Sequence, residues 1–367
     1  MVPFGDEMVM SNQRESIVIE NVSGQKLKKI PATVVTGFLG SGKTSLIQNL
    51  LTSANGQKIA LIINEFGDLG IDKELVLGCE IEGCSDGDIV ELANGCICCT
   101  VADDFLPTMK SLLDRSDPPD HIIIETSGLA LPKPLLKAFT WPEVRTRATV
   151  DGVVAVVDSV AVADGVFAND PLAVQKQREA DDSLDHETPL EELFEEQVQC
   201  ADIIVLNKAE LVSKEAWEAV EAKVLECQRS NVKSIKTSFG KIKPSVLLGL
   251  GAEAELDLGN RHSHHDGEEG HDHDDFDSFV VEFGEIENQI DFETKLRLIT
   301  KNHNVLRMKG FVSLKNKPMR LAVQVVGSRI EKYFDRPWQQ DEARYSRLVV
   351  IGFADLDKDG ISEILSF

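Results

Sequence analysis

The chain has 367 residues, of which 42% are hydrophobic and 27% charged, a composition typical of a soluble globular protein long enough for two domains. Its formal net charge of −24 argues against sequence-independent nucleic-acid binding, which needs a basic surface. No apolar run reaches the roughly eighteen residues of a membrane span, and no basic-then-apolar export signal opens the chain, so we expect no membrane partner.

Residues 1–29 are polar and mixed in charge, and we interpret them as a flexible leader. The pattern becomes regular after residue 29. Residues 32–35 form a short apolar run that predicts a buried strand, and an amphipathic stretch at 45–51 predicts a helix. A glycine-rich loop separates the two.

This loop satisfies the P-loop spacing G-x-x-x-x-G-K-[ST]. Its glycines let successive backbone N–H groups point inward as an anion nest, and the helix N-terminus adds its dipole. We expect Lys43 to reach the β- and γ-phosphates of a nucleoside triphosphate and the Thr44 hydroxyl to coordinate Mg²⁺. A chance glycine turn is the alternative, which the strand–loop–helix context disfavours. The nucleotide-binding residues expected here are Gly37, Gly40, Ser41, Gly42, Lys43, Thr44 and Ser45.

A second apolar run, residues 58–63, leads into a segment that carries Glu65 and Asp68. Carboxylates at the carboxyl end of a parallel strand lie on the edge where α/β sheets bind ligands. We therefore expect Glu65 and Asp68 to face Mg²⁺, the attacking water or a second metal, with Asp68 a candidate catalytic residue. A solvated turn explains the same pattern equally well.

Three cysteines, Cys96, Cys98 and Cys99, lie within four residues on a turn opened by Asn94. Thiols this close can converge on one ion, and cysteine is too uncommon for chance clustering. Buried inert thiols are the alternative. Three thiolates leave one tetrahedral position open, and Glu65 is a candidate fourth ligand.

Cys79 and Cys84 form a second pair in a nearby acidic loop, and they fit a structural role as well as metal binding. We expect a P-loop protein without an export signal to lie in the cytoplasm. There, the seven cysteines are expected to be thiols or metal ligands rather than disulfides.

A third apolar run, residues 121–124, ends in Glu125, with Gly128 three residues later. This pattern fits the second Mg²⁺-side element of a P-loop NTPase, where an acidic group acts through the metal or its water. We expect Glu125 to be catalytic through Mg²⁺ and the Gly128 N–H to sense the γ-phosphate. His121, at the start of the run, is interpreted as packed or exposed rather than as a ligand.

Apolar runs at 152–158 and 201–206 predict a fourth and a fifth strand. The fifth leads into Asn207, Lys208 and Glu210, where guanine-selective P-loop proteins typically carry N-K-x-D. The lysine packs along the base, and the carboxylate accepts hydrogen bonds from the guanine. Because Glu210 is one methylene longer than Asp, the selectivity for GTP over ATP stays open.

Residues 251–277 are almost devoid of apolar side chains and predict a disordered linker. Imidazoles and carboxylates at this density would bind divalent ions loosely, although a merely solvating linker is the alternative. Its histidines are His262, His264, His265, His271 and His273.

Strand-like patterns then return around an amphipathic segment at 292–299, which indicates a small α+β domain with a mainly antiparallel sheet. We therefore expect an α/β protein: a P-loop NTPase domain with a mainly parallel sheet flanked by helices, followed by this smaller domain. The predicted division is a leader at 1–29, a P-loop GTPase domain at 30–250, a linker at 251–277 and the α+β domain at 278–367.

The P-loop, the C-x-C-C thiols, the E-x-x-G segment and the N-K-x-E segment, with a histidine-rich linker and a small final domain, resemble the CobW family of P-loop GTPases. The resemblance covers the chain after residue 30, and C-x-C-C following a P-loop is specific to the family. It implies a GTPase metallochaperone whose thiols bind the metal and whose GTP cycle gates loading and release. Several stretches resemble members serving cobalamin biosynthesis, which implies Co²⁺ delivery to a cobaltochelatase.

The cofactors implied are GTP, Mg²⁺ and either Co²⁺ or Zn²⁺, and the partners are a metal-receiving client and a nucleotide-dependent homodimer. The thiols fall between Glu65 and Glu125, so we expect GTP to close the metal site and hydrolysis to open it. Three other readings remain: a Zn²⁺ chaperone, a metal storage or sensing protein with a structural nucleotide, and an ATP-dependent kinase or ligase. Thiolate sites suit both metals, and Zn²⁺ binds more tightly than Co²⁺.

Overall fold

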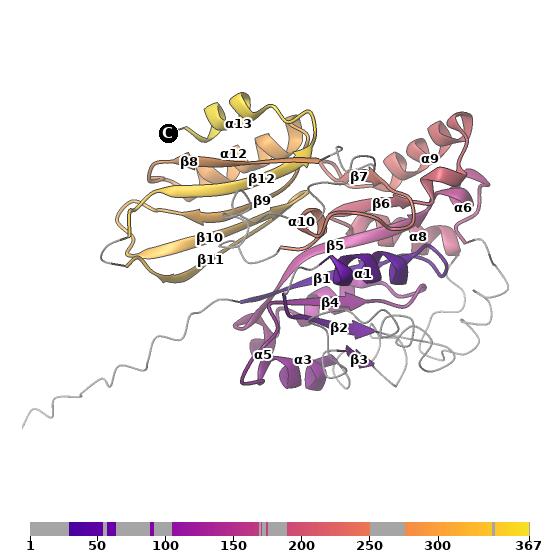
Figure 1. Cartoon of the computed structure of the whole chain (residues 1–367), viewed down its shortest axis with the longest axis horizontal. Helices are drawn as coiled ribbons and strands as arrows, with labels where there is room; N and C mark the ends of the chain where they lie inside the picture. The colour runs from indigo at the N-terminus through magenta and orange to yellow at the C-terminus, as the bar shows by residue number, and fades with distance from the viewer. Residues whose placement is uncertain are drawn as a thin grey trace, which may run out of the picture.

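The computed structural model contains two separate β-sheets, each with its own helices (Figure 1). The first sheet is parallel and seven-stranded, and the second is antiparallel and five-stranded. The predicted fold class is therefore confirmed. No helix in the described part of the chain is long and apolar enough to cross a membrane. The described residues are 29–53, 57–63, 89–91 (backbone only), 105–168, 170, 174, 189–249, 276–339 and 342–366.

The parallel sheet has the strand order β3-β2-β4-β1-β5-β6-β7. Its strands are short apolar runs that are buried on both faces, as expected where helices cover both sides of a parallel sheet. The register pairs Val35 and Ile63 with Glu125, so the carboxyl ends of three neighbouring strands meet at one edge. The strands are β1 (Ile30–Thr36), β2 (Ile59–Ile63), β3 (Ile89–Glu91), β4 (His121–Glu125), β5 (Ala148–Asp158), β6 (Ile203–Asn207) and β7 (Lys233–Lys236).

Helices cover both faces of this sheet. On one face α1 (Lys43–Thr52) and α10 (Pro244–Leu247) pack on alternate side chains of the strands, such as Val35 and Ile123. The intervening side chains, such as Val34 and Ile124, face the opposite layer. The helices of that layer are α3 (Leu106–Leu113), α4 (Pro132–Ala138), α5 (Pro142–Arg145), α6 (Ser159–Ala163), α8 (Leu190–Cys200) and α9 (Lys214–Cys227).

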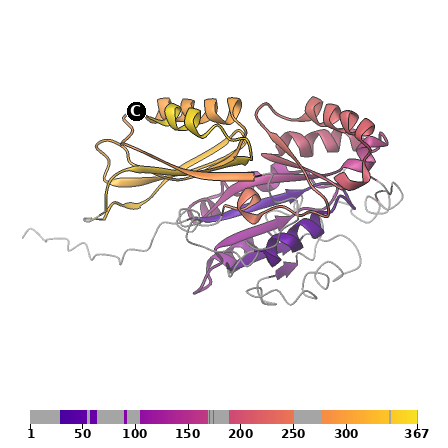
Figure 2. The same ribbon diagram turned by 45° about the horizontal axis from the view of Figure 1, so that its top comes forward.

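The antiparallel sheet has the strand order β11-β10-β9-β12-β8. Helices α12 (Gln289–Asn302) and α13 (Lys358–Leu365) lie together over one of its faces, as Figure 2 shows. The strands are β8 (Phe276–Phe283), β9 (Val305–Val312), β10 (Met319–Val326), β11 (Arg329–Pro337) and β12 (Ser346–Phe353).

The two sheets share an apolar contact. Leu306, Val326 and Val349, from the antiparallel sheet, belong to the same buried cluster as α1 and α10. One face of the antiparallel sheet is covered by α12 and α13. Its other face thus completes the core on one side of the parallel sheet. A Cβ added to Gly152 of β5 would meet the Val326 side chain at 3.5 Å, which places the strands β5 and β10 close together.

Candidate functional site

The P-loop joins β1 to α1 and takes a backbone path that only glycine adopts without strain. Gly37, Gly40 and Gly42 have φ values of 140°, 75° and 98°. A side chain at Gly37 would clash with the Val156 carbonyl oxygen, and one at Gly42 would clash with the Asn207 amide. The glycines are thus required both for the turn and for its close packing against β5 and β6.

Lys43, the first residue of α1, folds back over this loop. Its ammonium group donates to the carbonyl oxygens of Gly37, at 2.8 Å, and Phe38, at 3.1 Å. The side chain is buried, so the loop and the lysine form a compact positively charged cradle at the start of a helix. Of the other predicted loop residues, Ser41 is buried and Ser45 is exposed.

Thr44 and Glu125, which are 81 positions apart in the sequence, meet at the edge of the sheet. The Thr44 hydroxyl donates to Glu125 Oε1 at 3.2 Å, and Glu125 is buried at the end of β4. A hydroxyl and a carboxylate are oxygen ligands of the kind that Mg²⁺ prefers, so these two residues fit the predicted ion.

Gly128 packs against the same loop. A Cβ at Gly128 would lie 2.6 Å from the backbone nitrogen of Leu39, so no larger residue fits without moving the P-loop. Its carbonyl oxygen accepts a hydrogen bond from Gln197 Nε2 at 3.0 Å, which ties the segment to α8. The backbone at Gly128 is therefore held beside the P-loop, and sensing of the γ-phosphate by its N–H stays a prediction.

Asn207 links three segments of the site. Its amide nitrogen donates to the Ser41 carbonyl oxygen at 2.9 Å, and its amide oxygen accepts from the Gly240 backbone nitrogen at 2.9 Å. The P-loop, the end of β6 and the loop after β7 are thus joined through one buried side chain. Glu210 lies nearby in a 3₁₀ turn (Ala209–Leu211) and is exposed to solvent.

Asp158 is a member of this site that the sequence analysis did not assign. It ends β5 and caps α6, accepting from the backbone nitrogens of Val160 at 3.0 Å and Ala161 at 3.3 Å. Its second oxygen lies 2.5 Å from Lys208 Nζ, so the two form an ion pair. A carboxylate at the end of an apolar run was the available signal, the same one that identified Glu125.

The predicted ligands of the cargo metal lie outside the described residues. Among the residues that the structure does describe, no three His, Cys, Asp or Glu side chains gather in a way that would hold a metal ion. The described cysteines, Cys200 and Cys227, are buried free thiols whose pKa values are raised by burial. The predicted residues outside the description are Glu65, Asp68, Cys79, Cys84, Cys96, Cys98, Cys99, His262, His264, His265, His271 and His273.

Known proteins are similar to this chain over most of its length. The family model described as the CobW/HypB/UreG nucleotide-binding domain matches residues 31–235, and the cobalamin synthesis protein cobW C-terminal domain matches 276–366. The "Zinc chaperone CobW" of a Sinorhizobium species is 55% identical over 91% of this chain and 95% of its own length. The protein of the same name from Pseudomonas aeruginosa is 51% identical over 92% and 91%.

Among solved structures, the Zn(II)-bound YjiA GTPase from Escherichia coli aligns with 92% of this chain and 98% of its own, at 24% identity and a TM-score of 0.40. The two family models together span both sheets of the structure. The chain belongs to the CobW/HypB/UreG family of P-loop nucleotide-binding proteins and carries the C-terminal domain of its CobW members.

Proposed function

We propose that this protein is a GTP-hydrolysing metallochaperone that holds a divalent metal ion at Cys96, Cys98 and Cys99 and transfers it to a client protein. One observation carries the proposal: the strand that precedes the thiols ends at the nucleotide edge. Glu91, the last residue of β3, is paired with Ile63, which is also paired with Glu125. With strands spaced by about 4.8 Å, the backbones at Glu91 and Glu125 lie about 10 Å apart.

Chain length limits how far the thiols can be from this edge. Cys96 follows Glu91 by five positions, and five residues span at most about 18 Å. The first thiol of the proposed metal site therefore lies no more than about 18 Å from the strand end at Glu91. Coupling between metal and nucleotide then requires only that the metal site has different affinities in the two nucleotide states.

The nucleotide-binding residues have distinct roles in this proposal. Lys43 and the loop backbone bind the β- and γ-phosphates, and Thr44 with Glu125 would hold Mg²⁺, which neutralises phosphate charge when bound. Asn207 fixes the P-loop relative to the loop after β7, while Lys208 and Glu210 contact the guanine base. A catalytic role for Asp68 is a prediction that needs its own variant.

The metal we propose is Zn²⁺. The two relatives at 55% and 51% identity carry the name zinc chaperone, whereas the sequence analysis placed Co²⁺ first. A thiolate-rich site suits Zn²⁺, which also binds such sites more tightly than Co²⁺ does. Delivery to a cobaltochelatase and a nucleotide-dependent homodimer are separate predictions, as are the domain limits at 30–250, 251–277 and 278–367.

The test is GTP hydrolysis in excess Mg²⁺ by protein stripped of other metals, titrated in parallel with Zn²⁺ and Co²⁺, for the wild type and a Cys96/Cys98/Cys99→Ala variant. The matched control is Cys200/Cys227→Ala, which removes two thiols away from the proposed site. We expect metal to change turnover in the wild type and the control but not in the triple variant. Metal affinity, measured with a chromophoric chelator, should differ between the GDP and GTP-analogue states.

Each outcome separates the alternatives. If neither Zn²⁺ nor Co²⁺ changed the rate of GTP hydrolysis in any of the proteins, the protein would be an ordinary GTPase. If the protein bound metal but did not hydrolyse GTP, a storage or sensing role would be indicated. A response to Co²⁺ that is stronger than the response to Zn²⁺ at equal free concentrations would restore cobalt as the cargo. Turnover with ATP but not GTP would overturn the base assignment.

A further inference from the structure

Backbone strain is concentrated beside the base-binding segments. Among the described residues, four non-glycine residues have positive φ: Lys208 at 61°, Asn231 at 71°, Phe239 at 56° and Asn316 at 62°. Asparagine tolerates this conformation, but lysine and phenylalanine adopt it only at an energetic cost. Lys208 directly follows β6, and Phe239 lies three residues after β7. Costly conformations that persist at one place often mark a functional site.

The loop that carries Phe239 is held in place on both sides. Asn49 of α1 donates to the Phe239 carbonyl oxygen at 2.8 Å, and the Gly240 backbone nitrogen donates to Asn207 at 2.9 Å. A Cβ at Gly240 would lie 2.8 Å from the backbone nitrogen of Leu46, so the loop rests directly on the P-loop helix. The position of Phe239 is therefore fixed relative to the phosphate-binding loop.

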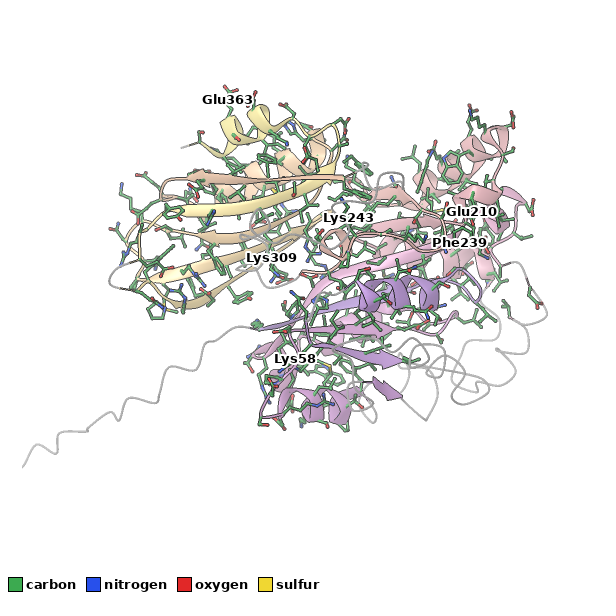
Figure 3. All side chains as sticks on the ribbon, viewed as in Figure 1. Lys58, Glu210, Phe239, Lys243, Lys309 and Glu363 are labelled. Atoms are coloured by element: carbon green, nitrogen blue, oxygen red, sulfur yellow. The ribbon has the colours of Figure 1, made fainter. Side chains whose placement is uncertain are left out.

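The same loop adjoins the 3₁₀ turn that carries Glu210, the residue predicted to contact the guanine base. The backbone nitrogen of Ala209 donates to the carbonyl oxygen of Thr237 at 3.1 Å, which joins the turn that carries Glu210 to the loop that carries Phe239. Figure 3 shows the two labelled side chains at the same end of the molecule. The Phe239 side chain is 65% exposed, so core packing does not explain why an aromatic residue occupies this strained position.

We propose that Phe239 stacks on the purine ring of the bound nucleotide, on the side opposite the Lys208 stem. This proposal rests on the nucleotide binding proposed above and adds a residue to it. Every base has a π-face, so stacking on an aromatic ring gives affinity without choosing between guanine and adenine. Selectivity then rests on Glu210, and Phe239 contributes equally to the binding of both purines.

The test measures equilibrium binding of GDP, ADP and tripolyphosphate to the metal-free protein and its variants. We expect Phe239→Ala to weaken GDP and ADP binding by the same factor, about tenfold, and to leave tripolyphosphate binding unchanged. Phe239→Tyr should bind like the wild type. The control Leu225→Ala removes a side chain that is 67% exposed on α9, and it should change no affinity.

A Phe239→Gly variant separates stacking from loop folding. Glycine adopts φ of 56° without strain, so this variant should lose the same affinity for GDP while its apo-protein melts no lower than the wild type. In a Phe239→Trp variant, GDP should quench the added indole fluorescence and tripolyphosphate should not.

Two results would overturn stacking. One is unchanged GDP affinity in Phe239→Ala. The other is equal weakening of GDP and tripolyphosphate, which would mean that the loop supports the P-loop instead. A wild type that binds tripolyphosphate but neither nucleotide would instead overturn the proposed function.

Discussion

The two ends of the parallel sheet use polar side chains in opposite ways, although the same strands supply both. At the carboxyl ends, Glu125 of β4 and Asp158 of β5 lie among loops that are predicted to meet a nucleotide. Near the amino ends, His121 of β4 and Asp151 of β5 are buried and face the antiparallel sheet. One end is the predicted nucleotide site, and the other pairs its polar groups with the antiparallel sheet.

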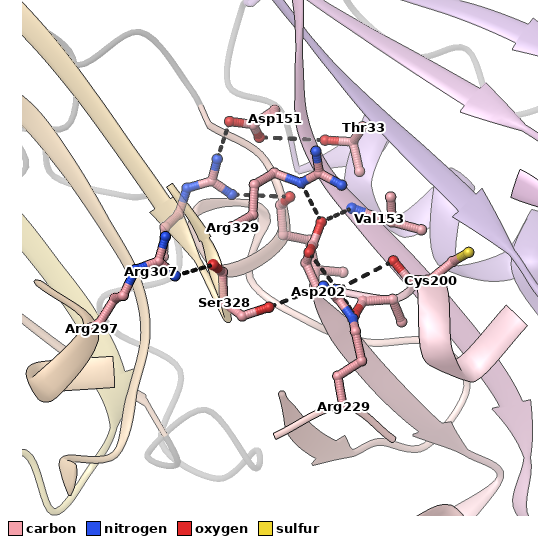
Figure 4. A network of polar contacts seen from close by, with 12 residues as sticks. Thr33, Asp151, Val153, Cys200, Asp202, Arg229, Arg297, Arg307, Ser328 and Arg329 are labelled. Atoms are coloured by element: carbon pink, nitrogen blue, oxygen red, sulfur yellow. Dashed lines mark hydrogen bonds and ion pairs between the residues drawn. The ribbon is translucent and has the colours of Figure 1, made fainter. Parts of the chain in front are cut away.

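The buried end is centred on Asp151 (Figure 4). Its carboxylate forms an ion pair with Arg307 of β9, and both side chains are almost fully buried. The same carboxylate accepts from the Gly249 backbone nitrogen at 2.6 Å and lies 3.5 Å from the Thr33 hydroxyl. Lys309 donates to the Gly249 carbonyl oxygen at 2.7 Å, so both backbone polar groups of Gly249 are hydrogen-bonded to buried side chains.

Asp202 forms a second contact of this kind (Figure 4). It accepts from the backbone nitrogen of Val153 at 3.0 Å, from Arg229 at 2.9 Å and from Arg329 of β11 at 2.7 Å. Buried carboxylates that are satisfied in this way hold the two sheets in one arrangement. We therefore expect charge removal at this end to reduce stability, and charge removal at the nucleotide end to reduce activity.

The largest expected effect tests the buried end. Replacing Arg307 with Met leaves the buried Asp151 carboxylate without its ion-pair partner, which should lower the unfolding free energy by about 3–5 kcal/mol. Thermal unfolding and urea titration would measure the loss. Hydrolysis per folded molecule, assayed well below the melting temperature, should stay near the wild-type value.

The double variant Asp151→Asn/Arg307→Met is the control for that experiment. It removes both charges and keeps an acceptor for the Gly249 backbone nitrogen, so most of the lost stability should return. A single variant as stable as the wild type would show that the ion pair is not what joins the sheets.

The reverse effect is expected at Lys43. Replacing it with Ala removes the positive charge from the phosphate cradle, and turnover should fall about a hundredfold or more while the apo-protein melts close to the wild type. Lys58→Ala is a matched control because Lys58 is an exposed lysine just before β2, at the opposite edge. If the Lys43 variant lost as much stability as Arg307→Met, the contrast between the two ends would not hold.

The sequence predicted the nucleotide end far better than the buried end, and locality explains why. The P-loop is contiguous, and strand ends predict where Glu125 lies, so their meeting follows from parallel topology alone. Asp151 and Arg307 are 156 positions apart, and each interrupts an apolar run without any motif around it. Which buried charges pair depends on how the two sheets pack, and no local pattern records that.

The strand β11 shows a similar limit within one element. The sequence analysis did not predict it because Arg329–Pro337 is mostly charged, its apolar and aromatic residues do not alternate regularly with the charged ones, and it ends in a proline. These are the features of an edge strand, which β11 is, paired only with β10 in the described sheet. Edge strands carry a weaker hydrophobic signal than the buried strands of a parallel sheet.

Acidification should distinguish the buried end through His121. Burial, with Lys309 and Arg307 nearby, lowers the pKa of His121 to about 4 despite Asp151, so the folded protein holds it neutral. The unfolded chain takes up a proton below about pH 6.5, and stability is therefore lost as pH falls from about 6.5 to 4, by up to about 3 kcal/mol.

Asp151 adds a second, lower pH range over which stability is lost. Burial raises its pKa, but Arg307 and Lys309 outweigh burial and lower it to about 2. Its stabilisation is present above the unfolded pKa of 3.8 and is lost as pH falls further towards 2. A His121→Gln variant should no longer lose stability between about pH 6.5 and 4, while the loss caused by Asp151 at lower pH should remain. If the plots of stability against pH for the variant and the wild type ran parallel from pH 7 to 4, the assignment to His121 would be refuted.

The smallest expected effect concerns Asp158, which shares features of both ends. It is buried like Asp151, but it pairs with Lys208, a residue predicted to contact the base. Asp158→Asn keeps an oxygen for the α6 cap and loses the charge that holds Lys208. We expect nucleotide affinity to fall about threefold to tenfold, with a change in stability under about 1 kcal/mol, because the variant removes a positioning charge rather than a phosphate contact.

Asp158→Ala completes the test. It also removes the cap on Val160 and Ala161, so stability should fall by about 1 kcal/mol more while the affinity loss stays the same. Isothermal titration with GDP and thermal unfolding of both variants separate the two roles. Equal affinity and equal stability in all three proteins would mean that the ion pair with Lys208 has no part in binding, and that the strained lysine is positioned by its backbone alone.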